Sequence, residues 1–342
     1  MSELRPATRF GVGSLADLGE LLAEVGVSRP LLVTTSRGAA HAPRIAAVEM
    51  YDGVLSHVPA STVREAAVLA RQVDADGLVG LGGGSAIDTC KAVAAELDPE
   101  GGVPTIAVPT TYAGAEWTTT YGMTLAPGQK SGGRGVRPVA AVYDPELTLS
   151  LPLADTVGTA MNALAHCAEA YYVEGANKKA SRDADCGATA IAYALPLVVA
   201  DPGSLYARTR LLEGAMRAAF ALGRSGLALA HAMAQALGGR YGLPHGAMNA
   251  LCLPPALEFN LGAVPEEIAR FGRMLGVDDA ADAPAKVRAL ARLGGFERLR
   301  DFGVPEVELP LVAEAAAARP GARLNPRGVA ASDVLELLAG VW

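Results

Sequence analysis

The chain has 342 residues, of which 51% are hydrophobic and 19% are charged, which is the composition of a globular protein with a sizeable core. A formal net charge of -7 leaves no basic field for a phosphate backbone, so we do not expect a nucleic-acid partner. The cysteines form no CxxC pair, the N-terminal stretch MSELRPATRF carries charge where a signal peptide is apolar, and no run of about 18 uninterrupted apolar residues occurs. We therefore expect a soluble, reduced, cytoplasmic protein without a membrane partner.

The first 150 or so residues alternate between helix-like and strand-like patterns. Such alternation predicts parallel strands joined by crossover helices, and hence an open α/β sheet. Helical spacing covers residues 14–26, 62–75 and 86–97; apolar runs typical of strands cover 30–36, 77–84 and 105–111; and 139–152 is typical of a last strand and its exit.

From about residue 151 the pattern changes to long segments rich in Ala and Leu at helical spacing, without a convincing strand. We predict two domains, a dinucleotide-binding α/β domain at 1–152 and a helical catalytic domain at 153–342, with ligands bound in a cleft between them. The predicted helices of the second domain cover 156–173, 180–199, 204–222, 226–238 and 246–260.

A glycine run follows the strand predicted at 77–84 and precedes a helix. Gly82, Gly83, Gly84 and Ser85 stand there, and glycines let the backbone approach a phosphate while the amides and the helix dipole face the anion. The motif is neither GxGxxG nor a Walker motif, so a tight turn without a ligand is the alternative interpretation.

A second polar loop follows the next strand, in AVPTTYAGAEWT, and it contains Thr110, Thr111, Gly114 and Glu116. Two such loops at neighbouring strand ends build the crevice in which open α/β sheets bind nucleotides. Together the two loops favour a dinucleotide site over a simple turn.

Three of the five histidines lie in separate motifs of the helical half: His166, His231 and His245. Asn162 precedes His166 by four residues and Gln235 follows His231 by four, so each pair shares one helix face. A single histidine is more often a satisfied core or surface residue. Three histidines in separate motifs favour a common polar site.

At these residues the sequence resembles the group III, iron-containing-type alcohol dehydrogenases, and within that family the maleylacetate reductase branch. The resemblance extends over essentially the whole chain, and the ordered set of motifs is far more specific than any one of them. The motifs are GGGSAIDTCKA, PTTYAGAEWT, YDPELTLSLP, MNALAHCAEAYYVEGAN, ALGGRYGLPHG, LPPALEFN and NPRGVAASDVLELL.

The resemblance implies a dehydroquinate synthase-like fold, with a Rossmann-like parallel α/β domain, an all-helical domain and the active site in the cleft. It also implies NADH- or NADPH-dependent carbonyl chemistry and a homodimer; the stretch VTTSRG leaves the choice between the two cofactors open. The residues it assigns to cofactor binding are Thr34, Ser36 and the neighbouring Thr35 near the adenosine; Gly82, Gly83, Gly84, Ser85 and Asp88 near the pyrophosphate; and Thr110, Thr111 and Thr118 near the nicotinamide.

Metal-dependent members of the family hold iron or zinc with one Asp and three His. In this sequence those positions are Asn162, His166, His231 and His245, so an amide replaces the carboxylate. A neutral ligand set binds a divalent cation less well, which implies a metal-independent enzyme, as in the maleylacetate reductase branch. The resemblance thus assigns catalysis to these four residues and Gln235, and predicts no metal.

The sequence also departs from that branch. Maleylacetate reductases have a motif similar to HHKLCH at the position where this chain has AHAMAQ. Gln235 stands where the branch has a histidine that is a proton donor candidate, and glutamine can orient a carbonyl or water but cannot act as an acid near neutral pH. Ala247 and Met248 likewise replace a polar pair. The candidate cations for an acidic substrate are Lys130, Arg134, Lys178, Lys179 and Arg240, each of which is also a typical surface charge.

We therefore expect an NAD(P)H-dependent reductase of a small oxo acid or enone, with maleylacetate to 3-oxoadipate as the type reaction. The substitutions at positions 230, 232, 235 and 248 motivate an alternative, a family member with a non-redox activity such as a dehydratase, cyclase or isomerase. A non-catalytic binding protein is the third hypothesis.

Overall fold

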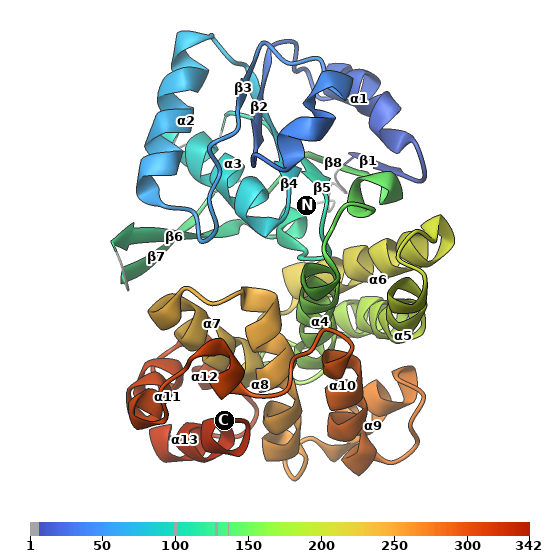
Figure 1. The fold of residues 1–342 in the computed structure, drawn as a ribbon, viewed down its shortest axis with the longest axis vertical. Coiled ribbons are helices and arrows are strands. Elements are labelled where there is room, and N and C mark those ends of the chain that lie inside the picture. Colours follow the sequence, from blue (N-terminus) through green and yellow to red (C-terminus); the bar gives the residue numbers. More distant parts are fainter. Residues whose placement is uncertain (1–6, 99–101, 127–128, 136) are drawn as a thin grey trace. The chain divides into compact units, whose positions relative to one another are not determined.

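The structure is a computed structural model that describes residues 7–98, 102–126, 129–135 and 137–342. Contacts within it divide the chain into two compact units, Met1–Ser150 and Leu151–Trp342. The first unit contains the sheets and the second is built of helices (Figure 1). The predicted succession of a parallel α/β domain and an all-helical domain is therefore confirmed.

A six-stranded sheet forms the centre of the first unit, and every neighbouring pair in it is parallel. The strand order is β1-β8-β5-β4-β2-β3, and its four central strands lie where the apolar runs predict them. The edge strands β1 and β3 are not predicted, because they are short and partly exposed and therefore lack an apolar run. The strands are β1 Ala7–Phe10, β2 Pro30–Thr34, β3 Glu49–Tyr51, β4 Gly77–Gly82, β5 Thr105–Pro109 and β8 Ala140–Tyr143.

Helices cover both faces of this sheet. Leu32 of β2 belongs to an apolar cluster with Leu18 and Leu21, whereas its neighbour Leu31 belongs to a second cluster with Val63. Adjacent residues of a strand point to opposite faces, so β2 contributes to both clusters and its sequence is a continuous apolar run. The helices of this unit are α1 Leu18–Glu24, α2 Ala60–Gln72 and α3 Gly84–Leu97.

An antiparallel hairpin lies outside the six-stranded sheet and consists of β6 Thr120–Ala126 and β7 Gln129–Arg134. The sequence patterns do not predict it, because this segment is rich in glycine and charge and lacks alternating apolar residues. The backbone N–H of Thr124 donates to the carbonyl of Val58, and further polar contacts join the hairpin to α3.

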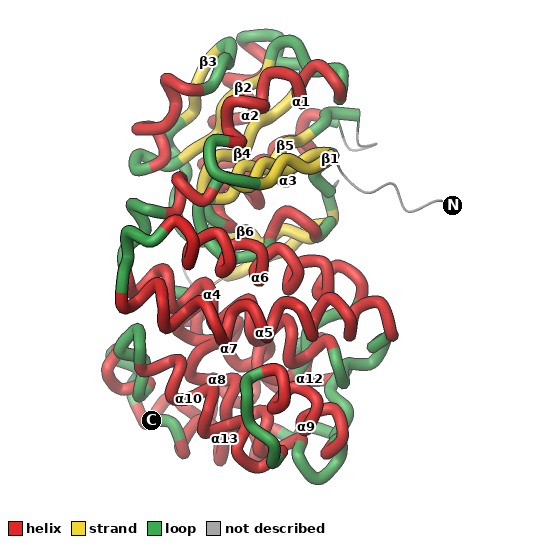
Figure 2. Tube along the Cα trace, turned by 90° about the vertical axis from the view of Figure 1, so that its right-hand side faces the viewer, coloured by secondary structure: helices red, strands yellow, loops and turns green. Residues whose placement is uncertain are grey.

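The second unit contains helices and loops, and Figure 2 shows no strand among its described residues. The five predicted helices are confirmed as α4 to α8. The helices are α4 Leu153–Ala170, α5 Lys178–Ala200, α6 Leu205–Arg224, α7 Leu229–Tyr241, α8 His245–Asn260, α9 Pro265–Met274, α10 Ala283–Arg292, α11 Leu309–Ala317, α12 Pro320–Arg323 and α13 Ala331–Gly340.

One described helix, α5, is long and apolar enough by length and composition to cross a membrane. Half of its apolar window is buried inside the unit, and α5 packs against α4 and α6. A core helix of a helical domain has these same properties.

Two glycines allow α4 and α8 to approach closely. A Cβ built on Gly246 would lie 2.4 Å from the carbonyl carbon and oxygen of Gly158, so any larger residue would push the helices apart. Because Gly246 follows His245 directly, this contact brings the start of α8 beside the helix that carries Asn162 and His166.

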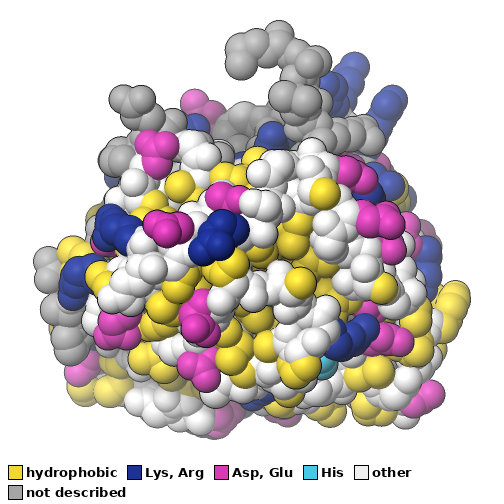
Figure 3. All heavy atoms as spheres, turned by 90° about the horizontal axis from the view of Figure 1, so that it is seen from above, with side chains coloured by type: hydrophobic (Ala, Val, Ile, Leu, Met, Phe, Trp, Pro, Cys, Tyr) yellow, Lys and Arg dark blue, Asp and Glu magenta, His cyan; other side chains and the backbone are white. Residues whose placement is uncertain are grey.

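Acidic and basic side chains are interspersed with hydrophobic ones on the face shown in Figure 3. Positive and negative side chains alternate over the described part of this face.

Candidate functional site

The glycine run forms the turn from β4 to α3 in the first unit. Gly82 has a φ of +151°, and Gly83 precedes the first residue of α3 without any side chain capping the helix. A Cβ on Gly83 would lie 2.9 Å from Cγ2 of Thr111, so a residue with a side chain at position 83 would push the two loops apart. Uncapped N–H groups and the positive end of the helix dipole can hold an anion such as a pyrophosphate.

The second predicted loop lies beside the first, as expected for neighbouring parallel strands. The backbone N–H of Thr110 donates to the carbonyl of Gly82 at 2.9 Å. The hydroxyl of Thr111 is buried and has no hydrogen-bond partner within the described residues. A buried hydroxyl without a partner is costly, and a polar group of a ligand over the glycine turn would satisfy it.

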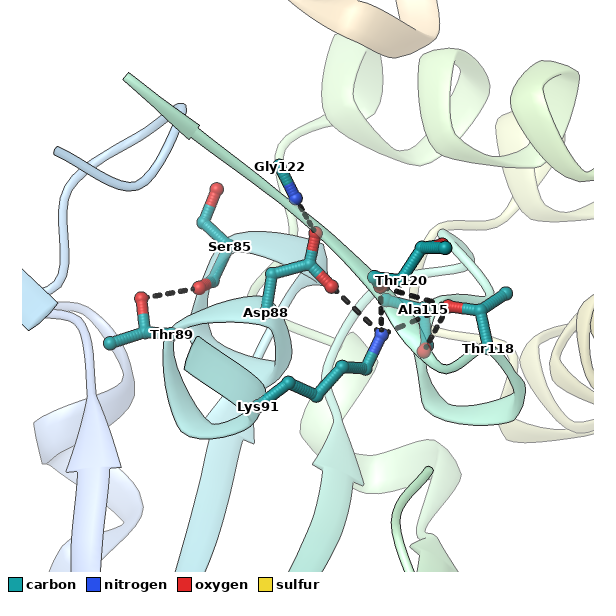
Figure 4. A network of polar contacts seen from close by, with 8 residues as sticks. All are labelled: Ser85, Asp88, Thr89, Lys91, Ala115, Thr118, Thr120 and Gly122. Carbon is teal, nitrogen blue, oxygen red and sulfur yellow. Dashed lines mark hydrogen bonds and ion pairs between the residues drawn. The ribbon is translucent and has the colours of Figure 1, made fainter. Parts of the chain in front are cut away.

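Lys91 organises the side chains around this turn, although the sequence patterns do not single it out. Its ammonium group is fully buried and donates to Asp88, to the hydroxyl of Thr118 and to the carbonyl of Thr120, each at 2.9 Å (Figure 4). The second carboxylate oxygen of Asp88 accepts from the N–H of Gly122 at 3.4 Å. The contacts of Asp88 and Thr118 are therefore internal ones that fix the hairpin and the preceding loop on α3.

The residues predicted near the adenosine lie after β2. Thr34 is fully buried, and its hydroxyl donates to the carbonyl of Leu81 at 2.7 Å, which joins β2 to β4. The hydroxyl of Thr35 accepts from the N–H of Gly38, and Ser36 is exposed. Of the three, Ser36 presents its hydroxyl to solvent.

The three histidines from separate helices come together in the second unit. His166 lies on α4, His231 on α7 and His245 at the start of α8. The rings of His166 and His231 are stacked with centroids 4.8 Å apart, and those of His231 and His245 are 5.8 Å apart. The tertiary structure thus gathers three imidazoles that spacing alone cannot bring together.

A buried carboxylate orients the central imidazole. Oε2 of Glu169 lies 2.7 Å from Nδ1 of His231, and the carboxylate also accepts the backbone N–H groups of Ala228 and His231 at the start of α7. Because Nδ1 donates to Glu169, Nε2 is the ring nitrogen that can bind another group. Nε2 is buried without a partner among the described residues.

His166 is buried beside these rings, and its Nδ1 also lacks a partner in the described part of the chain. Burial lowers the pKa of His166 well below its usual value, and the neighbouring His231 and His245 lower it further. The His166 imidazole is therefore neutral at pH 7 and offers a lone pair or an N–H without charge.

Asn249 connects two further members of the predicted catalytic set, Asn162 and His245. Its amide nitrogen lies 2.8 Å from Oδ1 of Asn162 and 3.0 Å from Nε2 of His245. Asn249 follows His245 by four residues, the spacing that paired Asn162 with His166, so the same helical argument could have identified it.

Gln235 lies one turn beyond His231 on α7, and Arg319 holds it. The guanidinium of Arg319 donates from Nη1 to the side-chain oxygen of Gln235 at 3.3 Å and from Nη2 to its backbone carbonyl at 3.2 Å. No local pattern marks Arg319, because it is distant in sequence from every motif of the histidine cluster.

The arrangement of donors is a poor fit for a divalent metal. The oxygen of Asn162 and the Nε2 of His245 both face the amide of Asn249, and no carboxylate belongs to the set that would offset a cation. Within the described residues, no group of three or more His, Cys, Asp or Glu side chains could hold a metal ion.

The candidate cations of the second unit do not join this cluster among the described residues. Lys178 and Lys179 are exposed, as is Arg134, and Arg240 pairs with Glu308 at 2.7 Å. The side chain of Lys130 lies outside the described residues.

Family models match nearly the whole chain. Residues 6–145 match the model of the iron-containing alcohol dehydrogenases, and residues 156–342 match the C-terminal model of the Fe-containing alcohol dehydrogenase family.

Individual proteins are similar over the same extent. The maleylacetate reductase of Sphingobium indicum is 38% identical over 339 residues, which cover 96% of this chain and 93% of the relative. That of Pseudomonas knackmussii is 37% identical over 346 residues, covering 98% and 96%. The crystal structure of maleylacetate reductase from Agrobacterium tumefaciens superimposes with a TM-score of 0.89 at 33% identity, covering 99% of this chain and 96% of that one.

Proposed function

This chain belongs to the iron-containing alcohol dehydrogenase family and is a nicotinamide-dependent oxidoreductase, and on that basis we propose that it reduces a small oxo acid or enone, with maleylacetate as the model substrate. The observation that carries the proposal is the buried imidazole cluster, in which His166 and His231 each keep one ring nitrogen without a partner among the described residues.

The proposed cofactor site is the glycine turn of the first unit. Support comes from the bare backbone at Gly83, the uncapped start of α3 and the buried hydroxyl of Thr111. These groups suit the pyrophosphate of NADH or NADPH. We propose that Thr110, Thr111 and Thr118 lie toward the nicotinamide and Ser36 toward the adenosine.

The histidines would stabilise the oxygen of the substrate during reduction. Reduced nicotinamide supplies a hydride when it is bound, and addition of hydride to a 4-oxo-2-enoate leaves negative charge on the keto oxygen. An imidazolium at His231 can donate Nε2–H to that oxygen, and Glu169 balances its charge. Protonation of the carbon next to the carbonyl completes the reduction, so one hydride and one proton are added across the double bond.

His245 is the member of the cluster suited to relay that proton. It is partly exposed, whereas His166 and His231 are 4% and 1% exposed, so solvent can reprotonate it. Asn249 contacts its Nε2 directly and is itself fixed by donating to the side-chain oxygen of Asn162.

We propose that the reaction needs no metal. The amide of Asn162 cannot supply the negative charge of a carboxylate ligand, and Asn249 offers an N–H to the atoms that a cation would have to contact. In this proposal the oxygen of the substrate is stabilised by imidazole donors in place of a Lewis acid.

The remaining expectations from the sequence are proposals of the same kind. The four cysteines are free, three of them buried, which supports a reducing compartment such as the cytoplasm. A homodimer is proposed because twofold dimers are the commonest soluble oligomers.

The test is a fluorescence titration of the chelator-treated protein with NADH and NADPH, followed by an absorbance assay with maleylacetate. Binding of one cofactor together with its substrate-dependent oxidation is expected. A protein that binds either cofactor but does not oxidise it with maleylacetate would require a different substrate class.

A further inference from the structure

Arg319 is a partly buried cation without an anionic partner. All hydrogen bonds of its side chain within the described residues go to Gln235, whose side-chain and backbone oxygens are both neutral. Its Nε is buried and has no partner in the part of the chain that the structure describes. The guanidinium group stays protonated in proteins, so a full positive charge persists at this place.

Several other arginines of the same unit are paired with carboxylates, although Arg327 donates to the carbonyl of Phe259. Arg270 donates to Asp185 at 2.6 Å and Arg240 to Glu308 at 2.7 Å. An unbalanced cation that is partly withdrawn from water is unfavourable for the folded chain, so its presence calls for an anion that arrives from outside.

The surroundings of Arg319 fix its position without cancelling its charge. The two contacts to Gln235 occupy one N–H of each terminal nitrogen, so further N–H groups of the planar fork remain for a carboxylate. A Cβ on Gly321 would lie 2.6 Å from the carbonyl oxygen of Ala228, which shows how closely α12 packs on the start of α7. Arg319 is thus held beside α7.

Through Gln235, Arg319 is joined to the helix that carries His231. Gln235 and His231 are four residues apart on α7, and residues at that spacing are neighbours on one helix face, about 5–6 Å apart at Cβ. A short oxo acid bound by its carboxylate at Arg319 would therefore extend its carbonyl group along this face of α7, toward His231.

We propose that Arg319, positioned by Gln235, binds a carboxylate of the substrate and selects acids over neutral carbonyl compounds. The assignment rests on the proposed reductase function and names the residue that determines its substrate class. It also gives Gln235 a role that requires no proton transfer, because a neutral amide orients the guanidinium and leaves its charge for the substrate.

The experiment compares Arg319→Met with Arg323→Met, which removes an exposed arginine of the neighbouring helix α12. We expect Arg319→Met to raise the KM for maleylacetate by about 10- to 100-fold, the usual effect of losing a charged hydrogen-bonded pair, with the nicotinamide Kd unchanged. Arg323→Met should leave the KM within about twofold, as expected for an exposed charge. Arg319→Lys keeps the positive charge but lacks the paired N–H donors of the guanidinium group. Its KM should therefore lie between the KM of the wild type and that of Arg319→Met.

An unchanged KM in Arg319→Met, or an equal loss of nicotinamide affinity and turnover in both Arg319 variants, would overturn the assignment while leaving the reductase function intact. If the wild-type protein does not oxidise NADH or NADPH with maleylacetate, the proposed function fails by itself. Calorimetric titration with 3-oxoadipate then decides the assignment: weaker binding by Arg319→Met supports it, and equal or absent binding by both proteins overturns it.

Discussion

The carboxylate of Glu169 lies 2.7 Å from Nδ1 of His231, and both side chains are almost completely buried. The same carboxylate accepts two backbone N–H groups at the start of α7, so one acidic side chain both caps the helix and orients the imidazole. This contact links the stability of the helical unit to the chemistry of its histidine cluster.

Replacing Glu169 by Gln removes the charge and turns one acceptor oxygen into a donor. We expect kcat to fall by about 100-fold, because the His231 ring loses the carboxylate that orients it, and the free energy of unfolding to fall by about 1–3 kcal/mol. Steady-state assays and urea denaturation measure the two effects. Glu174→Gln, an exposed substitution, is the control, and wild-type turnover in Glu169→Gln would contradict the role given to this pair.

Substitution of Gly83 by Ala tests the cofactor site. The new Cβ would meet the side chain of Thr111 at 2.9 Å and narrow the turn where the pyrophosphate is proposed to lie. We expect the Kd for the nicotinamide cofactor to rise at least about tenfold, since the backbone can no longer approach the phosphate closely. Gly19→Ala, where a Cβ meets nothing within 4 Å, should leave the Kd unchanged.

Substitution of Asn162 by Asp tests whether the amide keeps metal out. A carboxylate at this position would add the negative charge that a divalent cation requires, and the amide of Asn249 could still donate to it. We expect the variant to bind Zn²⁺ at least about tenfold more tightly than wild type, measured by calorimetry and by metal content after dialysis. Loss of wild-type activity on chelation, restored by Fe²⁺, would contradict metal independence.

Removal of His245 tests the proton relay. We expect His245→Ala to lower turnover by about 100-fold or more, as for loss of a general acid, while the nicotinamide Kd stays within about twofold of wild type. His41→Ala, in the first unit, serves as the control substitution. Parallel loss of cofactor affinity and turnover would argue against assigning cofactor and substrate binding to different units.

Glu116 makes the stability of the folded protein depend on pH. Burial raises the pKa of Glu116 above its usual value, and the hydrogen bond from the hydroxyl of Tyr143 and the charge of Lys91 offset this only in part. The folded state therefore holds a proton that the unfolded state releases above about pH 4.5, so stability falls as pH rises from there through the folded pKa.

Glu116→Gln removes this titration and keeps the shape of the side chain. The variant should gain stability relative to wild type as pH rises from 4.5 to 7.5, measured by thermal unfolding at each pH. A difference between the two proteins that does not change with pH would contradict a raised pKa for Glu116.

Several parts of the molecule follow from local sequence patterns. The apolar runs at 30–36, 77–84 and 105–111 predict central strands because both faces of such a strand are buried and every side chain must be apolar. Helical spacing locates α4 to α8 for a similar reason, since each helix buries a broad apolar face. Apolar patterns do not predict the edge strands or the hairpin β6–β7, because backbone pairing and polar contacts such as those of Lys91 hold these elements in place.

The candidate site divides in the same way. The sequence by itself determined the family, the glycine turn and the histidines with Asn162, because these features are encoded in contiguous motifs and in i, i+4 spacing. Only the tertiary structure decided that the three rings meet, that Glu169 orients His231, that Asn249 joins Asn162 to His245, and that Arg319 reaches Gln235 from 84 residues away. The physical reason is that hydrogen bonds and ring contacts depend on distance in space, and the packing of α4, α7, α8 and α12 sets those distances.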